Sequence, residues 1–141
     1  MGPLLTTLLS ITIATSPAND DTLTKNPGAI FYTSQQLLGS PYRSGGTTPK
    51  GFDCSGFTAY VYRQHGIPLT RTAHSQYKKS LFVAKKDAVP GDLVFFKTKN
   101  GWVYHVGIYA GNNKVTHSPK PGRKVRTEEI WSSRVSFGRM S

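Results

Sequence analysis

Cysteine and acidic residues are scarce in this chain of 141 residues. The single cysteine excludes an internal disulfide, and no Cys/His spacing fits a structural zinc site. Seven acidic residues stand against 18 Lys and Arg, which gives a net charge of +11. The basic residues are scattered and form no dense run, so we expect no nucleic-acid partner. They predict either a generally basic surface or a patch for an acidic polymer.

Long apolar runs are also missing, and no segment is long enough to span a bilayer. Residues 1–18 are small and apolar but lack the positive start of a signal peptide, so they fit a weak export signal as well as a loosely ordered leader. Residues 19–28 are polar and resemble a linker. We therefore divide the chain into 1–28, a leader, linker or signal remnant, and 29–141, one compact domain.

Helices are expected first in this domain. Apolar spacing predicts them over 29–38, from the N-cap Asp53 to a stop at Gly66, and over 72–79. The glycine-rich segment 44–51 is predicted to be a loop without regular structure.

Strands follow the turn at residues 90–91. They are expected over 92–96, 102–109 and 114–118, with a hairpin at 111–113, and one or two more are expected from Val125 and from 130–137. Helices followed by an antiparallel meander predict an α+β domain.

Cys54 falls in the first turn of the second predicted helix. A helix N-terminus lowers the pKa of a cysteine, and its N–H groups can hold an oxyanion. The adjacent Asp53 would raise that pKa, a conflict that disappears if its carboxylate caps the helix. A nucleophile is one interpretation of Cys54, and an inert buried thiol is the other.

A cysteine nucleophile needs a base, and there are four histidines. His65 is expected at a helix C-terminus, where it serves the helix dipole, and His74 is expected at the surface or along a groove. His105 begins an apolar strand, and His117 lies on the next strand across the hairpin. One imidazole can then orient the other, although such pairs are often only a satisfied polar contact.

Four segments resemble, in order, the motifs of the NlpC family of bacterial cell-wall cysteine peptidases, which have a reduced papain-like fold. They are GSPYRSGG at 39–46, GFDCSGF at 51–57, PGDLVFF at 90–96 and HVGIY at 105–109. The resemblance runs from about Ala29 to the C-terminus. It implies N-terminal helices packed on an antiparallel sheet of about five strands. Ser44 and Thr70 depart from the bulky apolar residue and the proline that the family commonly has there.

The resemblance also implies roles for individual residues. Cys54 is the expected nucleophile, His105 the general base and His117 the residue that orients the base. Tyr42 is expected near the oxyanion, and substrate contacts are expected from Asp53, Ser55, Arg71 and Gln76.

The implied function is a peptidoglycan endopeptidase, a thiol protease that needs no metal or organic cofactor. It would cut the bond from D-glutamate to diaminopimelate, or the cross-link from diaminopimelate to D-alanine, in the stem peptide. Stem peptides and a protein inhibitor or immunity partner are the expected partners, in the periplasm or at the cell wall after secretion. The alternatives are an antibacterial toxin with the same chemistry, a related amidase or acyltransferase, and, less favoured, a non-catalytic wall-binding module.

Overall fold

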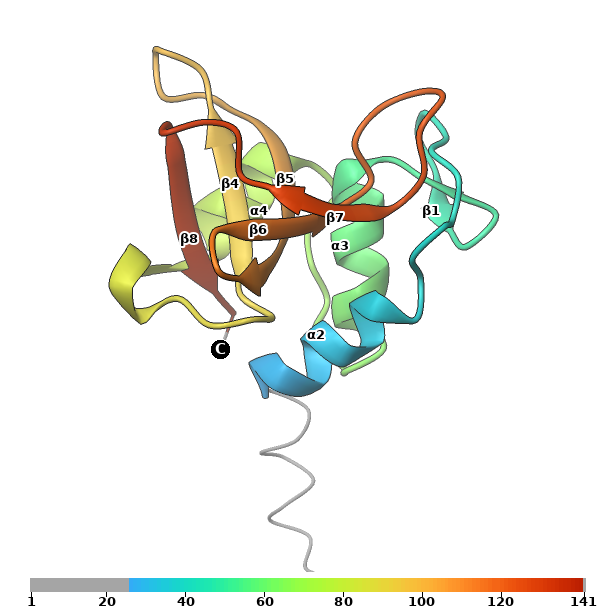
Figure 1. Cartoon of the computed structure of the whole chain (residues 1–141), viewed down its shortest axis with the longest axis horizontal. Helices are drawn as coiled ribbons and strands as arrows, with labels where there is room; N and C mark the ends of the chain where they lie inside the picture. Colours follow the sequence, from blue (N-terminus) through green and yellow to red (C-terminus); the bar gives the residue numbers. More distant parts are fainter. Residues whose placement is uncertain (1–25, 141) are drawn as a thin grey trace, which may run out of the picture.

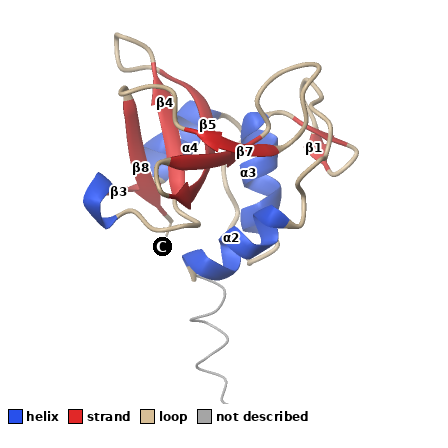
Figure 2. Cartoon of the chain, in the orientation of Figure 1, coloured by secondary structure: helices blue, strands red, loops and turns tan. Residues whose placement is uncertain are grey.

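The computed structural model describes residues 26–140, in which helices come first and a sheet follows (Figure 1). The helices are α2 (Pro27–Gln35), α3 (Cys54–Arg63), α4 (Ala73–Lys79) and a short 3-10 helix, η2 (Lys85–Asp87). Helices α3 and α4 both pack against strand β5 of the sheet (Figure 2). The predicted α+β architecture is therefore confirmed.

The main sheet of the described region has six strands in the order β3-β8-β4-β5-β6-β7, one more than the number expected. Every neighbouring pair is antiparallel. The strands are β3 (Leu81–Val83), β4 (Leu93–Lys97), β5 (Val103–Gly111), β6 (Lys114–His117), β7 (Arg126–Glu129) and β8 (Val135–Arg139).

Helix α2 begins at Pro27, two residues inside the segment predicted to be a linker. The Asn26 side chain caps it by accepting the N–H of Gly28 at 2.8 Å, and proline is well suited to the first turn because no N–H is needed there. The helix therefore begins two residues earlier than the 29–38 predicted for it. The rest of the predicted leader, 1–25, lies outside the described residues.

Helix α3 begins as expected. The Asp53 carboxylate caps it by accepting the N–H of Gly56 at 2.7 Å. A Cβ at Gly56 would collide with the carbonyl oxygen of Gly46, so glycine lets the preceding loop lie directly against the helix start.

The prediction that 44–51 has no regular structure is wrong. Two short strands pair there, β1 (Thr47–Thr48) and β2 (Gly51–Phe52). Two residues are too few to show strand alternation in a sequence. Strand β3 was missed because it is also short. It is a three-residue edge strand with two exposed side chains.

The hairpin between β5 and β6 brings the two strand histidines together. Asn112 and Asn113 have φ angles of 52° and 60°, the left-handed conformation that asparagine tolerates in tight hairpin turns. Ile108 lies opposite Thr116, and this register continues to place Gly107 opposite His117. His105, two residues before Gly107 on the same face, is then the diagonal neighbour of His117.

The core has two parts, one on each face of the sheet. The first lies between the helices and the sheet and includes Phe57, Val61 and Phe95, all fully buried. The second includes Val94, Phe96 and Phe137, and the alternation of residues 94–96 along β4 explains why the two parts share that strand. Among residues 26–140, no helix combines the length and the apolar character needed to cross a membrane.

Candidate active site

A groove of about 880 Å³ brings together four of the predicted site residues, Tyr42, Cys54, His105 and His117. Its lining also contains residues that the sequence did not point to: Tyr104, Pro119, Lys120, Arg123, Arg126, Glu128, Glu129 and Trp131. The predicted substrate contacts Asp53, Ser55, Arg71 and Gln76 are not among the lining residues.

Cys54 is a free, half-buried thiol at the first residue of α3. Burial raises its pKa, and this is the largest influence. Hydrogen bonding from the backbone of Val106, the residue after His105, acts in the opposite direction, as do the backbone groups at the helix start. Asp53 raises the pKa further, so capping the helix does not remove the conflict that the sequence posed.

His105, His117 and Glu128 form a chain of hydrogen bonds. His105 Nε2 lies 2.8 Å from His117 Nδ1, and His117 Nε2 lies 2.6 Å from Glu128 Oε2. His117 is 1% exposed, whereas Glu128 is 33% exposed at the edge of the groove. In the β6–β7 register His117 lies opposite Arg126, so Glu128 is again a diagonal neighbour.

The hydrogen bonds among His105, His117 and Glu128 determine which ring nitrogens carry protons. The Glu128 carboxylate can only accept, so His117 Nε2 carries a proton. His117 Nδ1 is then the acceptor in the neutral ring, and His105 Nε2 must donate to it. His105 Nδ1 is therefore left unprotonated, as a general base requires.

Burial holds both imidazoles in the neutral form. It lowers the pKa of His105 to about 3, with a second contribution from the neighbouring His117. Burial also lowers the pKa of His117, although the hydrogen bond and charge of Glu128 oppose this. The free site consequently favours a neutral thiol and a neutral imidazole.

Aromatic rings cover the histidine pair. Phe96 lies opposite His105 in the β4–β5 register, with ring centroids 5.3 Å apart. Trp131 stacks on Phe96 at 4.2 Å and reaches His117 at 5.4 Å. The packing of these rings contributes to the burial that lowers the pKa of both imidazoles.

Gly107 leaves room for His117. A Cβ on this glycine would lie 2.9 Å from the Cβ of His117 and 2.5 Å from a methyl carbon of Val115. The glycine of the HVGIY segment thus allows β6 to bring the second histidine close to the first.

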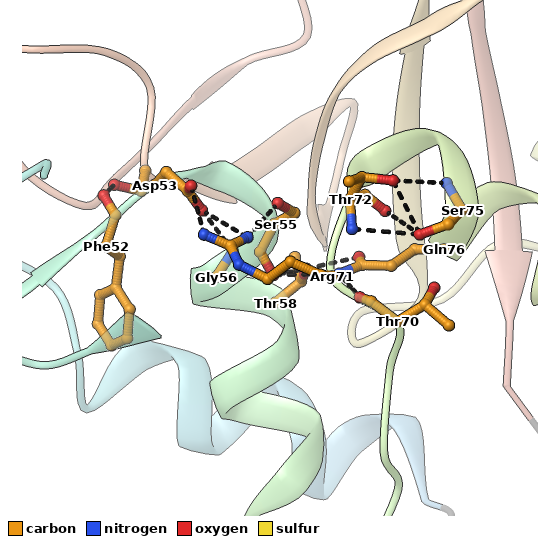
Figure 3. Close-up of polar contacts among 11 residues, drawn as sticks. Phe52, Asp53, Ser55, Gly56, Thr58, Thr70, Arg71, Thr72, Ser75 and Gln76 are labelled. Carbon is orange, nitrogen blue, oxygen red and sulfur yellow. Dashed lines mark hydrogen bonds and ion pairs between the residues drawn. The ribbon is translucent and has the colours of Figure 1, made fainter. Parts of the chain in front are cut away.

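A second polar cluster lies at the start of α3, around Asp53 and Ser55 (Figure 3). Arg71 forms an ion pair with Asp53, at 2.7 Å from Nη2 to Oδ2, and donates from Nη1 to Ser55 Oγ at 2.8 Å. The structure therefore brings these three predicted substrate contacts together, but as partners of one another.

Gln76 has a different position from the one predicted. Its side chain is fully buried, donates to the carbonyl oxygens of Ser55 and Thr70 at 3.1 and 2.9 Å, and accepts from Thr58 at 2.7 Å. All its hydrogen-bonding groups are occupied inside the protein, so the role seen in the structure is to connect α4 to α3. The segment could be predicted from the sequence, but the burial of this side chain could not.

The other two histidines are structural. His65 lies at the C-terminal end of α3 as predicted, whereas His74 is more than a surface residue. His65 bonds through Nε2 to Thr33 Oγ1 at 2.7 Å, so it ties α3 to α2. His74 is half-buried, accepts the backbone N–H of Val103 at 3.1 Å and stacks on Trp102 at 3.7 Å. These contacts depend on tertiary packing and leave no signal in the local sequence.

Tyr42 lies at the edge of the groove beside Cys54. Burial raises the pKa of its hydroxyl, and the neighbouring Cys54 and Asp53 raise it further, so the group is protonated and able to donate. Within residues 26–140, no group of three or more His, Cys, Asp or Glu side chains is arranged to hold a metal ion.

Known proteins resemble this chain in sequence. Probable endopeptidase p60 of Listeria seeligeri is 43% identical over 116 residues, which cover 79% of this chain and 22% of that protein. Gamma-D-glutamyl-L-lysine dipeptidyl-peptidase of Bacillus subtilis is 38% identical over 112 residues, covering 75% and 38%. Murein DD-endopeptidase MepH of Escherichia coli is 39% identical over 105 residues, covering 68% and 39%. The chain thus spans well under half the length of these curated relatives.

Solved structures agree with these relatives. The NlpC/p60 domain of the peptidoglycan hydrolase SagA superposes with a TM-score of 0.72 at 34% identity, covering 82% of this chain and 99% of that domain. An NlpC/P60 family protein from Bacillus cereus gives a TM-score of 0.74 at 34% identity, covering 80% and 39%. The sequence model of the NlpC/P60 family matches residues 39–136, which is more than half of the chain. On fold, motifs and sequence together, this chain belongs to the NlpC/P60 family.

Proposed function

We propose that this chain is a cysteine peptidase that hydrolyses amide bonds in the stem peptides of peptidoglycan, with Cys54 as nucleophile and His105 as base. The observation that carries the proposal is the hydrogen-bond chain from Glu128 through His117 to His105. It leaves an unprotonated nitrogen on His105 in the same groove as Cys54. Family membership and the peptidoglycan hydrolases among the relatives support the choice of polymer.

The first stage transfers the acyl group to sulfur. His105 Nδ1 takes the proton from Cys54 as the sulfur attacks the scissile carbonyl carbon, and the carbonyl π electrons move to oxygen. N–H groups at the start of α3 and the Tyr42 hydroxyl stabilise the oxyanion. When the intermediate collapses, the C–N bond breaks and His105 gives its proton to the leaving amine.

The second stage hydrolyses the thioester. His105 Nδ1 takes a proton from water as the water oxygen attacks the thioester carbon, and the C–S bond then breaks. The proton returns to the Cys54 sulfur, and the product is a carboxylic acid that ionises at neutral pH. His117 holds the ring of His105 in place and disperses the charge of the imidazolium in both stages, and Glu128 does the same for His117.

Two bonds of the stem peptide are candidate targets, D-glutamyl to diaminopimelate and the diaminopimelate to D-alanine cross-link. The named relatives include enzymes for related bonds, a gamma-D-glutamyl-L-lysine dipeptidyl-peptidase and a murein DD-endopeptidase. Both bonds lie in the cell wall, so the proposed site of action is the periplasm or the cell surface.

Digestion of purified muropeptides followed by mass spectrometry tests the proposal. The wild-type protein should cut one defined bond, and the masses of the products identify it. Cys54→Ala and His105→Ala should cut nothing above background. Undiminished cleavage by Cys54→Ala would refute the proposal.

The same digestion, repeated with an added free amine, distinguishes a hydrolase from an acyltransferase. Adding a free amine would divert the thioester from water only if the site accepts an amine as the second substrate. Products that all carry a new carboxylate support the hydrolase, whereas amide products in excess of the carboxylate support the acyltransferase.

A further inference from the structure

The loop that joins β6 to β7 places positive charge beside the groove. Lys120 and Arg123 of this loop line the groove, together with Arg126 at the start of β7. All three side chains are exposed at its edge. The acidic residues of the lining are Glu128 and Glu129.

Within the part of the chain that the structure describes, two of the three cations have no acidic partner in an ion pair. Arg126 lies 3.7 Å from Glu128, which also bonds to His117. The ion pairs found among residues 26–140 include neither Lys120 nor Arg123. Glu129 is then the remaining acid of the lining that opposes them. The Lys120–Arg123 side of the groove therefore has an excess of positive charge.

The loop is fixed to the segment that leads into Cys54. At one end Ser118 Oγ donates to the carbonyl oxygen of Phe52 at 2.7 Å. At the other end the N–H of Tyr42 donates to the Arg123 carbonyl at 3.0 Å, and buried Val125 donates to Ser40 at 2.8 Å. Figure 1 shows the orange loop after β6 lying beside the teal segment before α3. The cations thus project from a backbone whose position relative to Cys54 is set in advance, which reduces the entropy lost on binding.

We propose that Lys120 and Arg123 form a subsite for a free carboxylate of the bound peptide. Arginine can donate two parallel hydrogen bonds to a carboxylate, and lysine adds a point charge. A carboxamide of the same shape offers only one acceptor oxygen and no charge, so the subsite distinguishes unamidated from amidated peptides. The identity of the ligand rests on the proposed function.

Apart from its C-terminus, a stem peptide has two sources of such a carboxylate. One is the α-carboxylate of the D-glutamyl residue, and the other is the side-chain carboxylate of diaminopimelate. Two pairs of synthetic L-Ala-γ-D-Glu-diaminopimelate tripeptides, all with an amidated C-terminus, separate these sources. Within each pair, one member has the carboxylate in question free and the other has it as carboxamide.

Binding is measured by calorimetry with the Cys54→Ala protein, which cannot turn the peptides over. In one of the two pairs, the free carboxylate should bind about tenfold more tightly than the carboxamide. Lys120→Gln/Arg123→Gln in the same background should bring that ratio close to one. Glu129→Gln, which removes the opposing charge, should increase it.

A matched control is Lys78→Gln/Lys79→Gln, which removes the same charge from exposed positions on α4. It should keep the preference of the parent protein. The ratio within a pair is unaffected by partial loss of folded protein, because both peptides are measured on the same sample.

Three results would overturn the subsite: no preference in either pair, a preference that survives in Lys120→Gln/Arg123→Gln, or no binding of any of the four peptides. The proposed function fails separately. If the wild-type enzyme cleaves both members of each pair with equal kcat/KM, the function stands and the subsite does not. If Cys54→Ala discriminates within a pair but the wild-type protein cleaves neither member, the subsite stands and the peptidase does not.

Discussion

The strands that carry the histidines and the start of helix α3 hold polar pairs of nearly the same length in different surroundings. On the strand side, His117 and Glu128 are 2.6 Å apart and the imidazole is 1% exposed. On the helix side, Arg71 and Asp53 are 2.7 Å apart, and the arginine is 46% exposed. Water weakens the second pair far more than the first. The buried pair on the strand side therefore controls the protonation of the base. On the helix side, the hydrogen bonds of the buried Gln76 connect α4 to α3 more strongly than the exposed ion pair does.

The largest expected effect is a loss of stability in acid that arises on the strand side. Burial lowers the pKa of His105 to about 3 in the folded protein, whereas in the unfolded chain it is about 6.5. Between these values the unfolded state binds the additional proton, so stability falls as the pH drops below about 6.5. The free energy of unfolding should decrease by on the order of 3 kcal/mol between about pH 7 and pH 4.

Urea unfolding at the two pH values measures this decrease. His105→Gln removes the titrating group and should make the dependence on pH shallower. A variant that loses stability in acid as steeply as the wild type would show that the histidine pair is not its source.

His117→Ala should reduce kcat/KM by about a hundredfold, less than His105→Ala, because orienting a base contributes less than being the base. Steady-state hydrolysis of a soluble muropeptide gives both values. Equal losses in the two variants would mean that the roles of the two imidazoles have been assigned incorrectly.

Gln76→Ala should lower the free energy of unfolding by about 2 kcal/mol, because it removes three hydrogen bonds that a fully buried side chain makes to Thr58 and to the carbonyl oxygens of Ser55 and Thr70. Gln64→Ala is a matched control, since the Gln64 amide bonds to the Tyr60 carbonyl at the surface. Its effect should stay within about 0.5 kcal/mol. If Gln76→Ala keeps full stability but has a raised KM, the result would support the substrate contact that was predicted from the sequence.

Glu128→Ala should reduce kcat about tenfold, with little change in KM, because His117 loses the acceptor that fixes its tautomer. Glu128→Gln should recover much of the rate, since its amide oxygen still accepts from His117 Nε2. Nitrogen-15 NMR of the imidazoles reports the tautomer directly. An unchanged His117 tautomer in Glu128→Ala would exclude this positioning role.

Arg71→Ala should have the smallest effect on stability, below about 1 kcal/mol, because the ion pair is half exposed and Asp53 keeps its bond to Gly56. Thermal unfolding measures this change, and KM measured on the same protein tests whether Arg71 also contacts substrate. A stability loss equal to that of Gln76→Ala would remove the distinction between buried and exposed groups on the helix side.

Much of this arrangement could be predicted because it depends on neighbours in the sequence. Asp53 as a cap and Cys54 in the first helical turn follow from local pattern, as does the asparagine turn between the strand histidines. Glu128 could not be found in this way. Its contact with His117 depends on the β6–β7 register, and that pairing crosses a loop whose path the sequence does not determine.

The burial of Gln76 could not be predicted from the local sequence either. Its segment was placed correctly on a short helix beginning after Thr72, but a glutamine is usually exposed, and only tertiary packing makes this one fully buried. His65 and His74 also found partners that lie about thirty residues away along the chain. Long-range contacts of polar groups leave no periodicity to detect.

The sequence by itself determined the order of elements, the position of the thiol at a helix start and the two histidines on successive strands, because backbone propensity and alternation are local properties. The tertiary structure decided which nitrogen of His105 is free, which charges remain unpaired beside the groove and which polar residues are buried. Those properties depend on the exclusion of water and on distances between strands, and both exist only after the chain has folded.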